Sequence, residues 1–423
     1  MRKMKNSNIQ WIGAIPDSWH LDRLQWHLSE IKEQNSPIKT RQILSLTNKL
    51  GVIPYEEKGE QGNKSKENID EYKLAYPDTI VANSMNILIG SVGKCNYFGC
   101  VSPVYYVFKP KNGENIDFLN YIFQLTQFQK ELRKYANGIL EIRLRVSSND
   151  ILKRQIAFPS GKEQQKIVSF LNEKMAKIDK LIEIENKQIE KLKEYKQAVI
   201  TEAVTKGLDK SAPMKDSGVE WIGEIPENWA MNRLKFIATY NDDSLGEDTE
   251  ENAEISYVDI GSVSLEDGVT KIENFVFKDA PSRARRITRV GDIIVSTVRT
   301  YLKAIATINQ ENLIVSTGFC VIRPSETMNK RYVEFFCKSN KFTDEVSRNS
   351  YGISYPAINA SALINFWITI PPIETQEHVV EFLNEKCCKI DSLLKIKQKK
   401  IDMLNEYKKS LIYECVTGKK EVV

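Results

Sequence analysis

A nine-residue segment occurs twice in this chain, and the duplication constrains the fold more than any other feature. Residues 11–19 read Trp-Ile-Gly-Ala-Ile-Pro-Asp-Ser-Trp, and residues 221–229 read Trp-Ile-Gly-Glu-Ile-Pro-Glu-Asn-Trp. A longer repeat follows, because residues 159–205 align without gaps on residues 371–417 and match at about half of the positions. Solenoid repeats have periods of about 20–50 residues, so a period of about 210 residues predicts two whole domains instead.

Composition narrows the class of protein. The chain has 423 residues, of which 41% are hydrophobic and 27% are charged, as is usual for globular proteins of this size. No apolar run reaches the roughly 18 residues of a membrane span, and the basic residues 1–6 lead into no apolar signal core. The seven cysteines lack zinc-like spacing. We therefore expect a cytoplasmic protein without a membrane span, a disulfide or a bound metal.

Two long helices are predicted, one at the end of each repeat. From Leu171, and from its counterpart Leu383, hydrophobic residues recur in steps of three and four, which is typical of helices that pack together. A helix of about 40 residues is about 60 Å long, which is too long to bury its apolar stripe against one small domain. The residues expected to pair the helices are Leu171, Met175, Ile178, Ile182, Ile189 and Leu192 in the first repeat and Leu383, Ile390, Leu394, Ile401, Leu404 and Leu411 in the second.

Antiparallel packing of the two stripes would relate the repeats by a local twofold axis. Polar residues interrupt both stripes at equivalent places, Glu185 and Lys196 in the first repeat and Lys397 and Lys408 in the second. Glu185 and Lys397 are therefore a candidate ion pair across the helices. The alternative is two independent surface helices, each on its own domain, but this arrangement leaves the matched lengths and matched polar breaks unexplained.

Breaks in the pattern divide the chain into segments. Gly207 is a suitable helix C-cap, and Pro213 and Gly218 mark a loop between the repeats. We predict an α+β fold in which two pseudo-twofold-related domains are separated by two long helices that form an antiparallel coiled coil. The predicted segments are a first domain over 1–160, a first helix over 161–207, a linker and second domain over 208–371, a second helix over 372–418 and a tail over 419–423.

The two domain bodies share their predicted secondary structure but differ in their loops. The expected elements are buried strands at 80–82 and 293–295, further strands at 104–110 and 318–324, and helical patterns over 117–134 and 329–348. Between these elements the residues of the two repeats differ almost completely. The frame is therefore common to both repeats, and the loops are specific to each.

The polar loops of both bodies carry residue types that contact nucleic acid. Arg and Lys neutralise phosphates, Arg also matches guanine edges, and Asn matches adenine edges. The alternative is a solvated surface, and the net charge of +4 is modest, but the clusters fall at comparable places in both repeats. Tight turns at Gly138-Ile139 and Gly352-Ile353 are interpreted as further contact loops. The predicted DNA-binding residues are Asn63, Lys64, Lys66, Asn83, Ser84, Asn86, Arg143, Arg145, Arg283, Arg285, Arg286, Arg289, Arg299, Tyr301, Lys303 and Tyr351.

Patterns for catalysis or metal binding are weak. His20, His27 and His378 have no metal-ligand spacing, and residues 90–94 lack the full spacing of a phosphate-binding loop. The Asn-Pro-Pro-Tyr and Asp-Pro-Pro-Tyr strings of amino-methyltransferases do not occur. We expect neither a catalytic residue nor a metal ligand in this chain.

One segment resembles the metal-binding core of many nucleases. Asp17 follows Pro16, and Glu30-Ile31-Lys32 comes shortly after, so two carboxylates could hold Mg²⁺ while Lys32 orients water. Asp17 lies inside the duplicated Trp segment, whose second copy has Glu227 and no equivalent carboxylate-x-Lys. We therefore interpret the segment as structural packing.

In combination and order, these motifs resemble the specificity subunit of type I restriction-modification systems. The resemblance rests on the Trp-Ile-Gly-x-Ile-Pro-x-x-Trp segment of each half, on the Pro-x-x-x-x-Gln-x-x-x-Val-x-Phe-Leu-Asn-Glu-Lys entry to each long helix, and on Ala-Val-Thr-Lys-Gly-Leu-Asp at residues 203–209. It covers essentially the whole chain. Thr375 stands where the helix entry usually has Glu, as at Glu163, and this departure affects only local capping.

The resemblance implies two target recognition domains that each read one half of a bipartite sequence in double-stranded DNA, with the helices fixing the spacer between the half-sites. In such systems the subunit itself is not catalytic. It docks two methyltransferase subunits, which use S-adenosylmethionine to methylate adenine, and some complexes add ATP-driven restriction subunits that cleave DNA. S-adenosylmethionine, ATP and Mg²⁺ are therefore expected on the partner subunits only.

Two other functions stay open at this stage. A self-sufficient nuclease or methyltransferase is disfavoured, because neither half shows a credible active site. A coiled-coil scaffold that binds protein at both ends is the second alternative, and DNA binding in a mobility-shift assay would distinguish it from a recognition subunit.

Overall fold

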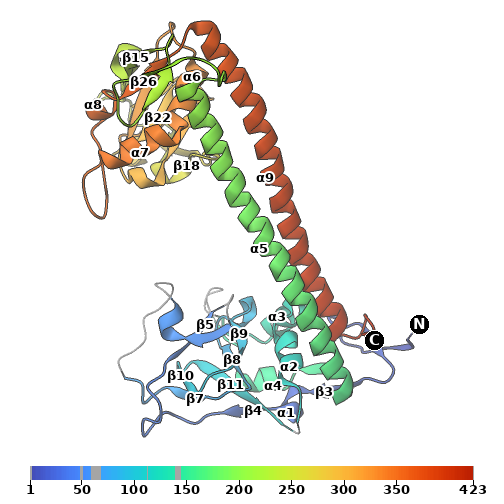
Figure 1. Ribbon diagram of the computed structural model, residues 1–423. Helices are drawn as coiled ribbons and strands as arrows, with labels where there is room; N and C mark the ends of the chain where they lie inside the picture. Colours follow the sequence, from blue (N-terminus) through green and yellow to red (C-terminus); the bar gives the residue numbers. More distant parts are fainter. Residues whose placement is uncertain (1, 48–50, 59–67, 112, 139–143, 423) are drawn as a thin grey trace. The chain divides into compact units, whose positions relative to one another are not determined.

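The computed structural model describes residues 2–47, 51–58, 68–111, 113–138 and 144–422. The chain divides into two compact units, whose elements are labelled in Figure 1. Unit 1 contains residues 1–185 and 399–423, and unit 2 contains residues 186–398. Each unit therefore combines the body of one repeat with part of both long helices.

A four-stranded antiparallel sheet forms the centre of unit 1. In spatial order its strands are β4 (Leu28–Ile31), β11 (Tyr105–Pro110), β8 (Thr79–Asn83) and β9 (Val92–Cys95). Every residue of β8 is buried, so this strand is covered on both faces. Ile80 and Ala82 belong to the main hydrophobic core, whereas Val81 belongs to a separate cluster. This alternation follows from the two-residue period of a strand.

The other elements of unit 1 are short and surround this sheet. The helices and helical turns are α1 (Leu24–His27), η1 (Tyr55–Lys58), η2 (Ile87–Ile89), α2 (Ile116–Phe123), α3 (Thr126–Arg133) and α4 (Ser148–Leu152). The paired strands are β1 (Met4–Asn6) with β2 (Ala14–Pro16), β3 (His20–Arg23) with β12 (Gln155–Phe158), β5 (Leu44–Thr47) with β6 (Gly51–Pro54), and β7 (Lys73–Ala75) with β10 (Gly99–Val101). Phe118, Phe123 and Phe128 on α2 and α3 complete the core.

Unit 2 contains a sheet of the same strand order and adds a second sheet. The common sheet runs β16 (Ala238–Tyr240), β25 (Phe319–Pro324), β22 (Ile293–Ser296) and β23 (Ile305–Thr307). The added sheet runs β20 (Glu273–Val276), β17 (Glu254–Val258), β24 (Leu313–Ser316) and β21 (Ala284–Ile287), with β17 and β24 parallel. The expected common frame is therefore present, and the second repeat elaborates it.

The remaining elements of unit 2 are again short. The paired strands are β13 (Met214–Asp216) with β14 (Glu224–Pro226), β15 (Ala230–Arg233) with β26 (Trp367–Ile370), and β18 (Val263–Ser264) with β19 (Gly268–Val269). The helices and helical turns are η4 (Leu234–Phe236), η5 (Ile260–Ser262), η6 (Phe277–Asp279), η7 (Thr300–Leu302), α6 (Lys330–Lys338), α7 (Asn340–Arg348) and α8 (Ala360–Leu363).

The two long helices are α5 (Gly161–Lys206) and α9 (Ile373–Val416), and within each unit they run antiparallel. Gly207 and Gly418 follow them with φ of 76° and 72°, the left-handed conformation that ends a helix. Every residue predicted to pair the helices is buried or half-buried. The fold is therefore the predicted α+β fold with paired helices, and the alternative of two independent surface helices is wrong.

Polar contacts between the helices repeat with the sequence. In unit 1, Lys408 pairs with Asp179 at 2.5 Å, and Lys400 pairs with the buried Glu185 at 2.6 Å. In unit 2, Lys196 pairs with Asp391 at 2.7 Å. Lys400 is thus a partner of Glu185 that the stripe alone did not indicate, while contact between Glu185 and Lys397 stays a prediction.

The C-terminal end of each long helix packs into the body of the opposite repeat. The end of α9 completes the core of unit 1, and the end of α5 completes the core of unit 2. Tyr413 near the end of α9 donates a hydrogen bond of 3.0 Å to the Trp11 carbonyl oxygen in unit 1. Tyr332 in unit 2 donates one of 3.0 Å to the Val204 carbonyl oxygen on α5. The buried residues supplied in this way are Leu411, Ile412, Cys415 and Val416 from α9, and Ile200, Ala203 and Val204 from α5.

The two shorter helical patterns are each divided. The sequence predicted one helical run over 117–134 and another over 329–348, but Leu125 and Ser339 adopt extended conformations that separate α2 from α3 and α6 from α7. The Ser339 hydroxyl accepts the Phe342 N–H, so it caps the new helix. Among the described residues, no helix combines the length and apolarity needed to cross a membrane.

Candidate nucleic-acid interface

Two surface loops of unit 2 are joined to each other, and we call them the unit 2 loop pair. They cover residues 298–303 and 351–357. The Arg299 N–H donates a hydrogen bond of 2.7 Å to the Pro356 carbonyl oxygen. Ala357 forms antiparallel bridges to Val298 in the first loop and to Tyr351 in its own loop. These backbone contacts make one surface from two segments that are distant in the sequence.

The unit 2 loop pair presents aromatic, apolar and cationic side chains to solvent. Tyr351 is 83% exposed, Ile353 is fully exposed, and Tyr301 and Tyr355 are more than half exposed. The Arg299 guanidinium lies over the Tyr355 ring, 4.7 Å from its centroid. Arg299 also has a φ of 52°, a conformation that non-glycine residues rarely adopt. Backbone strain of this kind is concentrated at functional sites.

Unit 1 joins two loops in a similar way, and we call them the unit 1 loop pair. They are residues 83–91 and the described part of 135–147. The Val146 N–H donates to the Ser84 carbonyl oxygen at 3.2 Å, which connects the two loops directly. In each unit, therefore, the first loop of the pair follows the equivalent strand of that unit's own central sheet, β8 in unit 1 and β22 in unit 2.

The second loop of each pair is closed by the same hydrogen-bond pattern. In unit 1, Asn137 and Arg145 exchange two backbone hydrogen bonds of 2.8 and 2.9 Å. In unit 2, Tyr351 and Ala357 exchange two of 2.9 Å. The frame of the loop pair is thus shared, while the residues that it carries differ between the units.

The structure separates the predicted DNA-binding residues of unit 1 into groups. Asn86 and Arg145 are exposed on the unit 1 loop pair. Asn83 and Ser84 are buried, and the Asn83 carboxamide oxygen accepts the Met85 N–H at 3.0 Å, so we correct their role to shaping the turn. Asn63, Lys64, Lys66, Arg143 and Ile139 lie outside the described residues.

Two predicted arginines of unit 2 have partners within the unit. Arg283 pairs with Asp259, and its Nε donates to the Tyr257 hydroxyl at 3.2 Å. The Arg285 guanidinium lies 4.7 Å from the centroid of the Phe277 ring. Both side chains are therefore positioned by neighbours on the added sheet or directly after its strands, although the Arg283 side chain remains 55% exposed.

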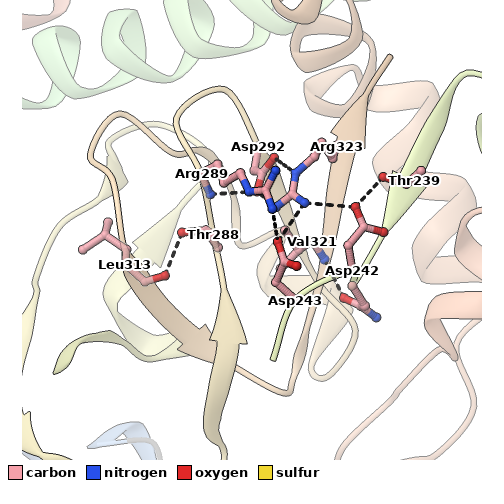
Figure 2. Close-up of polar contacts among 10 residues, drawn as sticks. Thr239, Asp242, Asp243, Thr288, Arg289, Asp292, Leu313, Val321 and Arg323 are labelled. Atoms are coloured by element: carbon pink, nitrogen blue, oxygen red, sulfur yellow. Dashed lines mark hydrogen bonds and ion pairs between the residues drawn. The ribbon is translucent and has the colours of Figure 1, made fainter. Parts of the chain in front are cut away.

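Arg289 belongs to a network of ion pairs between arginines and aspartates, which Figure 2 shows. Arg289 and Arg323 bind the same Asp243 carboxylate, at 2.8 and 3.0 Å, and Arg323 also binds Asp292 at 2.8 Å. The hydrogen bond from Arg323 holds the pKa of Asp243 below its usual value, and those to Asp292 raise the pKa of Arg323. Arg323, which the sequence did not single out, therefore has a structural role beside Arg289.

The last predicted residues of unit 2 differ in their surroundings. The Arg286 Nε is buried and, within the part of the chain that the structure describes, has no hydrogen-bond partner. Lys303 has a φ of 49° and pairs with Asp344 at 2.9 Å. Arg299, Tyr301 and Tyr351 are the exposed predicted residues that share the unit 2 loop pair.

The nuclease-like segment does not form a metal-ligand group. Across the described ranges, the three side chains with ligand atoms in mutual reach are His20, Asp22 and His27, and the group includes neither Asp17 nor Glu30. β3 and α1 bring His20, Asp22 and His27 together, an arrangement that their spacing in the sequence did not indicate, while the expectation of no bound metal stays a prediction.

Two α+β units that each carry a joined loop pair define a two-site recognition protein. The loops differ while their frame repeats, as expected for readers of two different targets. The chain belongs to the family of the type I restriction modification DNA specificity domain, whose model matches residues 26–194 and 226–406. It is a DNA sequence-recognition subunit and is not itself an enzyme.

Relatives and solved structures agree with this assignment. The type I restriction enzyme MjaVIII specificity subunit of Methanocaldococcus jannaschii is 26% identical over 311 residues, which cover 71% of this chain and 69% of the relative. A chain from a structural study of complex assembly and conformational transition of the type I R-M system matches with a TM-score of 0.71 at 13% identity, over 95% of this chain and 98% of that one. The HsdS subunit of Thermoanaerobacter tengcongensis matches with a TM-score of 0.52 at 13% identity, over 99% and 100%. Both structures share the fold of this chain.

Proposed function

We propose that each unit reads one half of a bipartite target in double-stranded DNA through its loop pair. The observation that carries the proposal is that both units close their loops with the same backbone hydrogen bonds but place different side chains on them. A shared frame fixes how each reader approaches DNA, and different side chains let the two readers recognise different bases.

The exposed loop residues have the chemistry that base reading needs. Arg299 in unit 2 and Arg145 in unit 1 carry the guanidinium that matches guanine edges, and Asn86 carries the carboxamide that matches adenine edges. Tyr351 offers an aromatic ring and a hydroxyl for sugar or phosphate. Among the predicted arginines, Arg283 and Arg289 are assigned to phosphates, because both are exposed but already oriented by carboxylates.

The long helices are proposed to set the spacer between the half-sites. At about 1.5 Å per residue, the 46 residues of α5 and the 44 residues of α9 correspond to about 69 and 66 Å. Successive major-groove faces on one side of DNA are about 34 Å apart, so a change of helix length changes which base pairs a reader can meet.

An insertion tests this function directly. Four residues, about one helical turn, are added at equivalent positions of α5 and α9 in the full-length chain, and methylated sites are sequenced in cells that also express a methyltransferase subunit. The two half-site sequences should stay the same and the spacer should change. An unchanged spacer would contradict the spacer role, and a single undivided site would contradict the two-reader function.

The outer faces of the helices are proposed to dock two methyltransferase subunits. Exposed apolar residues mark protein-binding surfaces, and here they recur at equivalent positions of both repeats, as two identical partners require. The equivalent exposed residues are Leu181 and Leu393, Ile184 and Ile396, and Tyr195 and Tyr407. Each unit contains one leucine, one isoleucine and one tyrosine of these pairs.

The cofactors follow from this division of labour. S-adenosylmethionine is proposed to reside on the methyltransferase subunits, and ATP and Mg²⁺ on restriction subunits in complexes that contain them. The complex would act in the cytoplasm, where it has access to DNA. Asp17 and Glu30 of the nuclease-like segment are not part of the metal-ligand group found among the described residues, so this segment does not support a self-sufficient nuclease.

A further inference from the structure

A polar cluster lies in unit 1 apart from the loop pair, where β3 and α1 meet. His20 and Asp22 are two residues apart on β3, so their side chains point to the same face of the strand. His27, at the end of α1, completes the group. Each residue offers one ligand atom, and these atoms all lie within 4.8 Å of one another.

His27 is oriented by contacts on both edges and one face of its ring. Its Nδ1 is 2.9 Å from Glu114 Oε1, and its Nε2 is 3.1 Å from Asp22 Oδ2. The ring stacks on Phe158 with centroids 3.5 Å apart. A histidine that binds a metal usually donates its second ring N–H to a carboxylate, which fixes the tautomer. Glu114 occupies that position, and the Nε2 lone pair then faces Asp22.

We propose that His20, Asp22 and His27 bind a zinc ion. Two imidazole nitrogens and one carboxylate oxygen are typical zinc ligands, whereas Mg²⁺ prefers oxygen alone. Ligands at about 2.0–2.1 Å from a tetrahedral ion are about 3.3 Å apart, close to the 3.1 Å between His27 Nε2 and Asp22 Oδ2. His20 is exposed, so the ion has a route of entry and water can complete its coordination.

The second repeat provides an internal comparison. The positions of His20, Asp22, His27 and Glu114 are occupied there by Ala230, Asn232, Ile237 and Met328. Ile237 and Met328 are buried in the same hydrophobic core. The fold therefore does not require His27 and Glu114 at the buried positions, since the second repeat has apolar side chains at both. Metal binding supplies a reason for four polar residues in unit 1.

The site would connect the body of unit 1 to its long helix. Glu114 accepts a hydrogen bond of 3.0 Å from the Gln164 carboxamide in the first turn of α5. In the second repeat the equivalent Gln376 faces the Met328 sulfur at 3.7 Å, which is a weaker contact. Zinc on His27 would strengthen the charge-assisted bond to Glu114 and, through Gln164, the attachment of α5.

Histidine NMR gives a direct test, because the full-length chain contains three histidines. Side-chain signals are followed as Zn²⁺ alone is added, with Mg²⁺ in a parallel titration. The signals of His20 and His27 should shift until one equivalent of Zn²⁺ is bound, and Mg²⁺ should leave them in place. The signal of His378, which is exposed on α9, should not move.

Variants distinguish zinc binding at this site from binding to a cysteine thiolate, which is another common zinc ligand. His20→Ala should weaken Zn²⁺ binding by at least about tenfold, and the matched exposed variant His378→Ala should leave it unchanged. Glu114→Gln should weaken binding by about 10–100-fold through the orientation of His27. The fourfold variant His20→Ala, Asp22→Asn, His27→Ile, Glu114→Met copies the second repeat, so it should fold and lose the site.

Two results would overturn the proposal. The first is Zn²⁺ binding of equal affinity in the wild type and the fourfold variant, which would assign the metal to other ligands. The second is a His27 signal that responds to pH but not to Zn²⁺. Burial lowers the pKa of His27 but its hydrogen bonds to Glu114 and Asp22 raise it overall, so this result would make the cluster an imidazolium ion pair. Neither result bears on DNA recognition.

Discussion

Lys196 on α5 and Asp391 on α9 form an ion pair of 2.7 Å in unit 2, and the equivalent Lys408 and Asp179 form one of 2.5 Å in unit 1. The lysine of each pair comes from the later half of its helix, and the aspartate comes from the earlier half of the other. Reciprocal contacts of this kind are what self-complementary antiparallel packing of two equivalent sequences produces. The duplication is therefore expressed in individual contacts as well as in the fold.

Asp391→Ala is expected to destabilise unit 2 only slightly, by about 0.5–1 kcal/mol, because the aspartate side chain is 44% exposed and solvent screens the pair. Lys196→Asp and Asp391→Lys should each destabilise unit 2 as single variants, and the double variant with both changes should recover most of that stability. Thermal unfolding of the wild type, these two single variants and the double variant measures the coupling energy. Strictly additive effects would mean that the ion pair contributes nothing.

Gly418→Ala is expected to cost more stability than Gly113→Ala, although both glycines have a φ of 72°. The left-handed conformation costs a non-glycine residue about 1–2 kcal/mol at either position. A Cβ at position 113 meets nothing within 4 Å, whereas one at 418 would lie 2.6 Å from Pro16 Cγ and 3.3 Å from Trp19. This overpacking adds about 1–3 kcal/mol. Urea unfolding compares the two variants, and equal losses would contradict the close packing of Gly418.

Arg299→Ala is expected to weaken binding of the specific DNA by about 1–3 kcal/mol and to relax base preference in one half-site only. Arg289→Ala is the matched comparison, because Arg289 is held by Asp243 and assigned to a phosphate, so its loss should weaken binding of every DNA sequence alike and leave base preference unchanged. Fluorescence anisotropy with the complex and sequencing of methylated sites measure both effects. An equal loss of affinity for every DNA sequence would assign Arg299 to a phosphate instead.

Ile184→Asp and Ile396→Asp are each expected to remove one methyltransferase subunit from the assembled complex. These side chains are 41% and 62% exposed, so the fold should tolerate the change. Asn186→Asp is the control, because it introduces a charge about 200° around α5 from Ile184. Size-exclusion chromatography with light scattering gives the stoichiometry, and complexes that keep both partners in the two variants would rule out these docking faces.

The long helices and their pairing could be predicted because a helix repeats its contacts every three to four residues, and this period is visible in one sequence. The break within a shorter helical run was harder to foresee. Ser339 is a typical N-cap residue, but the equivalent Leu125 is not, and it makes no side-chain cap hydrogen bond. The position of that break depends on packing rather than on local propensity.

The loop pairs and the histidine cluster could not be predicted for a different reason. The bond from Val146 to Ser84 and the contact between His27 and Glu114 connect residues that are remote in the sequence, and no short motif records them. A comparison of the two repeats offered one clue. His27 is replaced by Ile237, which indicates that the position lies in the core.

The exchange of helix ends makes the two halves of the chain mutually dependent. The core of unit 1 includes Leu411 and Val416, and the core of unit 2 includes Ile200 and Val204. A cut near residue 210 would give two fragments, each with one body but without the helix end that completes its core. Each fragment would then have to obtain that helix end from the other fragment or from a second copy of itself. Recombination that replaces one body can therefore preserve folding only if it keeps these terminal helical turns compatible.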